Sequence, residues 1–198
     1  MKSTTKILLV ALGAGLLGAA AGLLMNGPGP LLRSEVGQRA LQGAMSATAP
    51  PAPEGLQVAG RGDPMPTLQL PDLEGQAVEL PAAYAGRPIL INFWASWCGP
   101  CIEEMPELDR FAATQGDGGV QVVGIALDMP GDVAGFLEHT PVRYPILLEQ
   151  PGPRDSGVQL GNPKGVLPYT ALIDADGRLV KQKIGPFQHG EIEGWVGG

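Results

Sequence analysis

The chain has 198 residues, of which 44% are hydrophobic, so it has room for one packed domain plus accessory segments. Asp and Glu outnumber Lys and Arg by 20 to 13, which gives a formal net charge of −7. Nucleic-acid binding needs a basic surface that neutralises phosphates, so this balance argues against a nucleic-acid partner. The two cysteines are too few for a domain that relies on disulfides for its stability, and the pair is therefore available for chemistry.

The first segment of the chain is predicted to be a membrane anchor. Lys2 and Lys6 precede an uncharged stretch at 7–25 that is rich in Leu, Ala and Gly. A helix of that length rises roughly 28 Å, close to the ~30 Å hydrocarbon core of a bilayer. The lysines favour a cytoplasmic N-terminus, which makes the chain a single-pass inner-membrane protein with its remainder in the periplasm. The alternative is a signal peptide cleaved near 19–21, which would leave a soluble periplasmic protein.

The sequence divides into an anchor at 1–25, a tether at 26–58 and one folded domain at 59–198. Proline, glycine and alanine dominate the tether and oppose regular structure, although 31–45 is compatible with a short helix.

Alternating strands and helices are predicted in the folded domain. Strands are expected at 67–70, 77–80, 88–94, 120–127, 144–148, 169–174 and 178–184, and helices from about 98, at 132–139 and at 191–196. The runs at 88–94 and 120–127 are apolar throughout, as in strands buried on both faces. Hairpin turns are expected at 74–75 and at 175–177. The pattern predicts an α/β domain with a mixed sheet.

The two cysteines lie where a buried strand ends and a helix begins, in the segment Trp97-Cys98-Gly99-Pro100-Cys101. A helix N-terminus offers unpaired N–H groups and a positive dipole end, both of which stabilise a thiolate. Cys98 should gain most from this position, whereas Cys101 lies one turn further in and should be more buried. We therefore expect Cys98 to attack a substrate disulfide and Cys101 to resolve the resulting mixed disulfide.

A metal site is the alternative use of such a cysteine pair. Structural zinc normally takes four protein ligands, and only His139 and His189 remain, neither at a finger-like spacing from the cysteines. Soft thiolates also suit Cu(I), so a second hypothesis, from a different functional class, is a tethered copper-binding module. For the preferred hypothesis, disulfide exchange by the cysteine pair, neither a metal nor a cofactor is predicted.

Two stretches resemble the TlpA/ResA-like branch of the thioredoxin superfamily. The first is NFWASWCGPC at 92–101 followed by EEMP at 103–106, and the second is LPYT at 167–170 followed by ALIDADG at 171–177. The likeness covers about 60–198. It implies a thioredoxin fold, in which helices flank a central mixed β-sheet, here with an N-terminal β-hairpin extension. It also implies thiol–disulfide oxidoreductase activity.

The resemblance assigns residues to the substrate side of the site. Pro168 matches the family's cis-proline, which faces the cysteine pair, and Leu167 before it would touch the substrate. Trp97 matches the aromatic residue that flanks the nucleophile, and Gly99 and Pro100 complete the expected substrate-binding set.

Proton handling is assigned by the same resemblance. Glu104 matches an acidic residue that this branch places near the cysteines, and a carboxylate beside a thiol can accept its proton. Glu103 fits an exposed acid on the helix surface better. Asn92 stands where cytoplasmic thioredoxins carry an aspartate, and asparagine cannot titrate. Tyr169 departs from the threonine that many family members carry after the cis-proline, which puts the substrate preference in doubt.

The family resemblance also implies a direction and partners. The Gly-Pro dipeptide between the cysteines matches reducing thioredoxins, so the expected function is reduction of specific protein disulfides in the periplasm. Apocytochrome c is the family's leading substrate class, and a membrane thiol carrier of the DsbD/CcdA type is the expected electron donor. A disulfide oxidase or isomerase of the same fold is the alternative direction.

Overall fold

The structure is a computed structural model that describes Ile7 and residues 29–197. The anchor predicted at 1–25 therefore lies outside the described residues, apart from Ile7. Within the described residues, no helix is both long enough and apolar enough to cross a membrane. The chain divides after Leu41 into two compact units.

The described part of the first unit is helical. It contains α2 (Gly29–Arg33) and the beginning of α3 (Glu35–Ala47), which continues into the second unit. Between the two helices, the hydroxyl of Ser34 accepts a hydrogen bond from the backbone N–H of Gly37 at 3.1 Å and so caps α3. The short helix that the sequence allows at 31–45 is thus present, but it is interrupted at Ser34.

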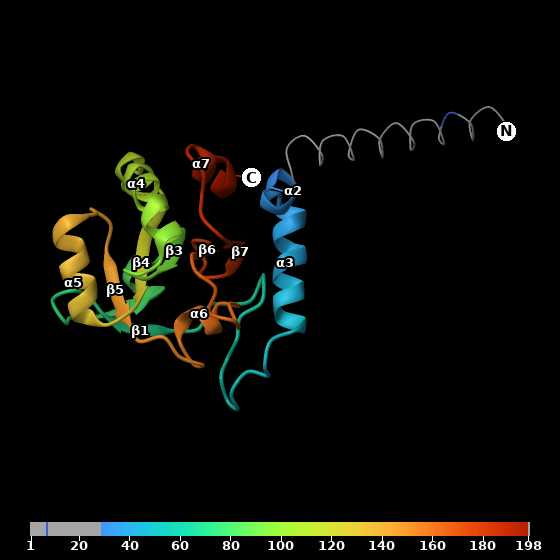
Figure 1. The fold of residues 1–198 in the computed structure, drawn as a ribbon, viewed down its shortest axis with the longest axis horizontal. Helices are drawn as coiled ribbons and strands as arrows, with labels where there is room; N and C mark the ends of the chain where they lie inside the picture. The colour runs from blue at the N-terminus through green and yellow to red at the C-terminus, as the bar shows by residue number, and fades with distance from the viewer. Residues whose placement is uncertain (1–6, 8–28, 198) are drawn as a thin grey trace. The chain divides into compact units, whose positions relative to one another are not determined.

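A five-stranded mixed sheet forms the centre of the second unit (Figure 1). Its strands are β3 (Ile89–Trp94), β4 (Gln121–Leu127), β5 (Ile146–Glu149), β6 (Tyr169–Ile173) and β7 (Leu179–Ile184). Their spatial order is β5-β4-β3-β6-β7. Strands β3, β4 and β5 are parallel, whereas β6 runs antiparallel to both β3 and β7. β3 is buried along its whole length and β4 nearly so, as their unbroken apolar runs predict.

Three helices pack against one face of this sheet: α4 (Gly99–Thr114), α5 (Pro130–His139) and α7 (Glu191–Gly197). Their apolar side chains share one buried cluster with Leu90 and Trp94 of β3. The cluster includes both cysteines, so the helix that carries them is fixed to the sheet by the hydrophobic core.

The opposite face of the sheet is covered by the N-terminal hairpin. β1 (Leu68–Pro71) pairs antiparallel with β2 (Ala77–Leu80) in a sheet of its own, around a turn in which Gly75 has a φ of 79°. Apolar side chains of the hairpin pack against Ile91 and Phe93, which point to this face of β3. The predicted β-hairpin extension and the predicted α/β architecture are both confirmed.

Two short helices were not predicted. These are η1 (Ala82–Tyr84), which follows a cis Leu80–Pro81 bond, and α6 (Ser156–Gln159). Asp155 caps α6, because its Oδ1 accepts a hydrogen bond from the backbone N–H of Val158 at 2.8 Å. Both helices lie in stretches rich in turn-forming residues, where no hydrophobic period marks a helix.

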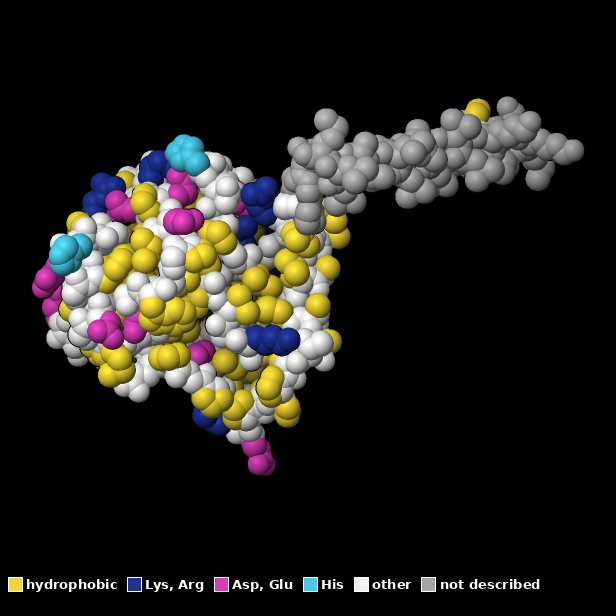
Figure 2. All heavy atoms as spheres, in the orientation of Figure 1, with side chains coloured by type: hydrophobic (Ala, Val, Ile, Leu, Met, Phe, Trp, Pro, Cys, Tyr) yellow, Lys and Arg dark blue, Asp and Glu magenta, His cyan; other side chains and the backbone are white. Residues whose placement is uncertain are grey.

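Charged side chains are dispersed over the face of the molecule drawn in Figure 2, where acidic and basic groups are interspersed with hydrophobic ones. Large hydrophobic side chains that remain exposed in the second unit include Trp97, at 70%, and Met129, at 54%. Trp97 directly precedes Cys98, and Met129 directly follows Asp128.

Candidate redox site

Cys98 and Cys101 form a disulfide at the N-terminus of α4, just beyond the end of β3. Cys98 is the N-cap residue of the helix, and its carbonyl accepts hydrogen bonds from the N–H groups of Cys101, at 3.0 Å, and Ile102, at 3.1 Å. Its side chain makes no capping hydrogen bond. The Cys98 sulfur is therefore attached at the positive end of α4, where the helix dipole stabilises a thiolate.

The two sulfur-bearing residues differ in exposure. Cys98 retains 6% of its surface, whereas Cys101 retains none. Trp97, Gly99 and Pro100 are exposed around Cys98. A substrate sulfur can therefore approach Cys98 but not Cys101, which agrees with the expected order of attack and resolution.

The loop before Cys98 is held in place by Asp128, a residue that the sequence analysis did not identify. One oxygen of Asp128 accepts hydrogen bonds from the N–H and the hydroxyl of Ser96, at 2.9 and 2.7 Å, and the other accepts from the N–H of Met129, at 2.8 Å. Burial tends to raise the pKa of Asp128, but these hydrogen bonds outweigh it and lower the pKa below its usual range. The only signal in the sequence is that Asp128 directly follows a buried strand parallel to β3.

Pro168 lies beside the end of β3 that leads to the cysteines. The Leu167–Pro168 peptide bond is cis, as the resemblance implies, and Tyr169 pairs with Phe93 in the register of β6 and β3. Leu167 packs against the cluster that contains both cysteines. Within the part of the chain that the structure describes, its N–H and C=O make no backbone hydrogen bond. The main chain at Leu167 is therefore able to pair with an extended peptide.

Glu104 is a buried acid one turn along α4 from Cys101, and a spacing of three residues places both on the same face of the helix. It is 1% exposed. Its Oε1 accepts a hydrogen bond from the side-chain amide of Asn92 at 2.8 Å, and its Oε2 accepts from the N–H of Phe187 at 2.8 Å. Burial raises the pKa of Glu104 to about 7, although both hydrogen bonds act in the opposite direction. The group can thus exchange a proton near neutral pH.

Asn92 completes the buried polar centre of the site. It is fully buried, and its amide also donates to the hydroxyl of Thr170 at 3.1 Å. Glu103, by contrast, is exposed, as expected. The structure therefore joins Asn92 and Glu104 directly, a contact that the family motif does not reveal.

Comparison with known proteins decides the family. A family model described as Redoxin matches residues 61–194. The thiol-disulfide oxidoreductase ResA of Bacillus thuringiensis (strain Al Hakam) is 31% identical over 139 residues, covering 68% of this chain and 76% of the relative. ResA of Geobacillus thermodenitrificans (strain NG80-2) is 32% identical over 121 residues, covering 61% and 67%. The chain belongs to the ResA/TlpA-like branch of the thioredoxin superfamily.

Solved structures of related proteins share the fold of this ResA-like chain. A thioredoxin-related protein from Neisseria meningitidis serogroup B is 31% identical, with a TM-score of 0.57 over 65% of this chain and 96% of that one. A thiol:disulfide interchange protein of Chlorobium tepidum TLS is 23% identical, with a TM-score of 0.59 over 71% and 97%, and it supports the fold alone. The predicted thioredoxin-like fold is confirmed. The chain is a thiol–disulfide oxidoreductase with a redox-active CxxC disulfide, and protein disulfides are its substrates.

Neither histidine of this ResA-like chain lies in a metal-binding cluster within the described residues, where no three His, Cys, Asp or Glu side chains are grouped closely enough to hold an ion. The Nδ1 of His139 contacts the carbonyl of Gly135 at 3.0 Å, and that of His189 contacts the carboxylate of Glu107 at 3.0 Å. Both histidines are exposed, one at the end of α5 and the other just before α7.

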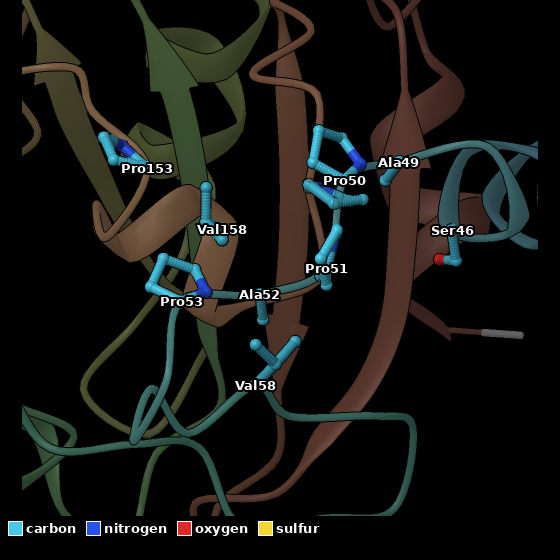
Figure 3. A pocket seen from close by; sticks show the side chains of 11 residues that line it. Ser46, Ala49, Pro50, Pro51, Ala52, Pro53, Val58, Pro153 and Val158 are labelled. Atoms are coloured by element: carbon cyan, nitrogen blue, oxygen red, sulfur yellow. The ribbon is translucent and has the colours of Figure 1, made fainter.

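A pocket of about 380 Å³ in the second unit is lined by none of the site residues (Figure 3). Prolines dominate its wall: Pro50, Pro51 and Pro53 come from the segment after α3, and Pro153 and Pro163 come from either side of α6. This Pro-rich segment belongs to the predicted tether, and it has neither helix nor strand. The pocket lining contains neither a cysteine nor a titratable side chain, so we do not assign the pocket to the redox reaction.

Proposed function

We propose that the chain is a membrane-anchored reductase of specific protein disulfides that works in the periplasm. The observation that carries the proposal is the position of Cys98 at the N-cap of α4, where it keeps 6% of its surface while Cys101 keeps none, with the buried acid Glu104 one turn beyond Cys101. The Gly99-Pro100 dipeptide between the cysteines, which matches reducing thioredoxins, supports the direction.

In the reducing direction, the Cys98 thiolate attacks one sulfur of the substrate disulfide, and the other substrate sulfur leaves as a thiolate that takes up a proton. The Cys101 thiol then passes its proton to the Glu104 carboxylate. The resulting Cys101 thiolate attacks the Cys98 sulfur, and the second substrate sulfur leaves. Two electrons have passed to the substrate, and the enzyme holds the Cys98–Cys101 disulfide.

Substrate contacts are proposed for the residues around Cys98. The exposed Trp97, Gly99 and Pro100 border the attacking sulfur, and the unpaired main chain of Leu167 suits pairing with a substrate strand. Pro168, next to the end of β3, holds Leu167 in this position.

The proposed location rests on the sequence before the described residues. Lys2 and Lys6 followed by the uncharged stretch at 7–25 support an anchor with its N-terminus in the cytoplasm. An oxidising compartment also suits a chain whose only cysteines form a redox disulfide. Recovery, in the soluble fraction of lysed cells, of a chain that begins after 19–21 would contradict the anchor and favour a cleaved signal peptide.

The direction of exchange is tested by the reduction potential of the Cys98–Cys101 pair. We expect a value near that of thioredoxin, about −270 mV, because a reductase must hold its electrons less tightly than its substrate does. Equilibration with glutathione or dithiothreitol, followed by alkylation and mass spectrometry, measures it. A value of about −120 mV, typical of a strong periplasmic oxidant, would overturn the proposed reductase in favour of an oxidase.

The proposed substrates are apocytochromes c, whose haem-attachment cysteines must be reduced, and the proposed donor is a membrane thiol carrier of the DsbD/CcdA type. A Cys101→Ser variant cannot resolve the mixed disulfide, so it is expected to keep its substrate bound to Cys98. Mass spectrometry of the trapped complexes should identify apocytochrome c peptides. The double variant that also carries Cys98→Ser is the control and should trap nothing. Complexes that lack cytochrome c peptides would refute this substrate class.

A further inference from the structure

A row of polar residues crosses the sheet beneath α4. In the strand register, Asn92 of β3 lies opposite Thr170 of β6, and Thr170 lies opposite Lys183 of β7. Directly opposed residues on neighbouring strands point to the same face of a sheet. Asn92 and Thr170 lie on the face covered by α4, because Leu90, Trp94 and Leu172, two residues away along the same strands, belong to the cluster around that helix.

Lys183 is the charged end of this row. Its side chain is 1% exposed, and its ammonium donates to Oε1 of Glu191, at the start of α7, at 2.8 Å. The ammonium also lies 5.1 Å from the centre of the Phe187 ring. A lysine is almost never fully buried, and burying its charge costs free energy that one ion pair only partly returns. A role beyond packing would explain why an ammonium group is held at this position.

The segment between Phe187 and Glu191 connects Lys183 with Glu104. At one end, the N–H of Phe187 donates to Glu104, and at the other the N–H of Gln188 donates to Oε2 of Glu191 at 2.8 Å. Lys183 and Glu104 thus contact the same short segment, one through the Phe187 ring and the other through its N–H.

The groups that face Glu104 come from every element packed against it. They are Asn92 from β3, Thr170 beyond it on β6, Lys183 from β7, Glu191 from α7, and Tyr144 from the segment before β5. Asn92 and Thr170 carry no charge, and burial raises the pKa of Tyr144, which keeps its hydroxyl neutral. Lys183 is the only cation in this set and Glu191 the only other anion.

We propose that Lys183 is a positioning residue that sets the protonation state of Glu104. Its ammonium favours the Glu104 carboxylate in a buried place that otherwise favours the neutral acid, and Glu191 moderates this effect. The consequence for catalysis rests on the proposed proton transfer from Cys101, because only an ionised Glu104 can accept that proton. Lys183 therefore keeps the acceptor usable near neutral pH without touching the substrate or the cysteines.

The opposed charges of Lys183 and Glu191 predict opposite effects when each is removed. Titration of the Glu104 carboxyl carbon by NMR in the oxidised, full-length, ¹³C-labelled protein measures the midpoint directly, with Glu104→Gln used to assign the signal. In Lys183→Met we expect the midpoint to rise from about 7 by roughly one pH unit. In Glu191→Gln it should fall, and in Lys183→Arg, which keeps the positive charge, it should stay close to the wild-type value.

Lys181→Met is the matched control, since Lys181 lies on the same strand and donates to the carbonyl of Trp195 at 2.9 Å. It should leave the Glu104 midpoint unchanged. An unchanged Glu104 midpoint in a folded Lys183→Met protein would overturn the proposal. An equal rise of the midpoint in Lys183→Met and Lys181→Met would overturn it too. If Lys183→Met fails to fold, Lys183→Gln, which also removes the charge but keeps a polar side chain, decides the question in the same way.

A second measurement separates this inference from the proposed function. The pH dependence of the Cys101 step is followed by the release of a model peptide held in a mixed disulfide on Cys98. A rate profile that moves with the Glu104 midpoint supports both proposals. A midpoint that moves while the rate profile stays fixed supports the assignment of Lys183 and refutes the proton role of Glu104.

Discussion

Replacing Cys98 with serine is expected to reduce disulfide exchange by at least about 1,000-fold, measured as insulin reduction in the presence of dithiothreitol. A serine hydroxyl stays protonated at neutral pH and cannot form the mixed disulfide, so the first covalent step is lost. Cys101 cannot take over this role because it has no exposed surface, whereas Cys98 retains 6%. Activity that survives in Cys98→Ser would contradict the assignment of Cys98 as the attacking residue.

The Cys101→Ser variant should separate the two roles. It loses turnover as well, yet its Cys98 remains at the N-cap of α4 and should react rapidly with iodoacetamide. In Cys98→Ser, the remaining Cys101 should be alkylated far more slowly because it is completely buried. Equal alkylation rates would show that the exposure of the two thiols does not determine the order of attack.

Local patterns in the sequence are enough to predict most of the fold. The unbroken apolar runs at 88–94 and 120–127 predict β3 and β4, because strands buried on both faces need no polar alternation. The position of Cys98 at a helix N-terminus follows from the same reasoning, since the helix begins where the first of these runs ends. The short helix α6 has no such signal, because a single turn capped by Asp155 has no hydrophobic period.

Contacts between distant segments were the part that the sequence did not reveal. Asp128 and Ser96 lie 32 residues apart and meet because β3 and β4 are parallel neighbours whose carboxyl ends lie at the same edge of the sheet. Nothing in the sequence distinguishes Lys183 from the other polar residues of the strand predicted at 178–184, and only the register places it opposite Thr170. The proposed proton acceptor, Glu104, was inferred from the family motif. Its environment depends on the pairing of β3, β6 and β7, which no single segment of the sequence reveals.

Glu104→Gln is expected to change how stability depends on pH, by about 3 kcal/mol between pH 4.5 and pH 8 relative to the wild type. Burial raises the pKa of Glu104 from its ordinary value of 4.5 to about 7. The folded wild type therefore holds this proton more tightly than the unfolded chain does. The stabilisation is complete below pH 4.5 and is lost as the pH rises through 7, because the folded protein must then bury a carboxylate. Glutamine carries no such charge at any of these pH values.

The slope of unfolding free energy against pH separates the lost charge of Glu104→Gln from its lost hydrogen bond. A glutamine amide cannot accept from both Asn92 and the N–H of Phe187, so it leaves one buried donor unpaired at a cost of about 1–3 kcal/mol at every pH. That constant cost displaces the whole curve of unfolding free energy without changing its slope. Urea unfolding of the oxidised protein across this pH range separates the two effects. Parallel curves for the variant and the wild type would contradict the raised pKa.

The rate of the Cys101 step should depend on the same ionisation of Glu104. If Glu104 accepts the Cys101 proton, the Cys101 step accelerates as Glu104 ionises near pH 7, and this acceleration should be absent in Glu104→Gln. Glu103→Gln is the matched control, because the neighbouring acid is exposed and should alter neither the slope of stability nor the rate profile. The wild type loses stability as the pH rises from 4.5 to about 7, and it gains speed at the upper end of this range, where Glu104 ionises in the folded protein. In the proposed mechanism, the same buried carboxylate destabilises the resting enzyme and accepts the proton of the resolving thiol.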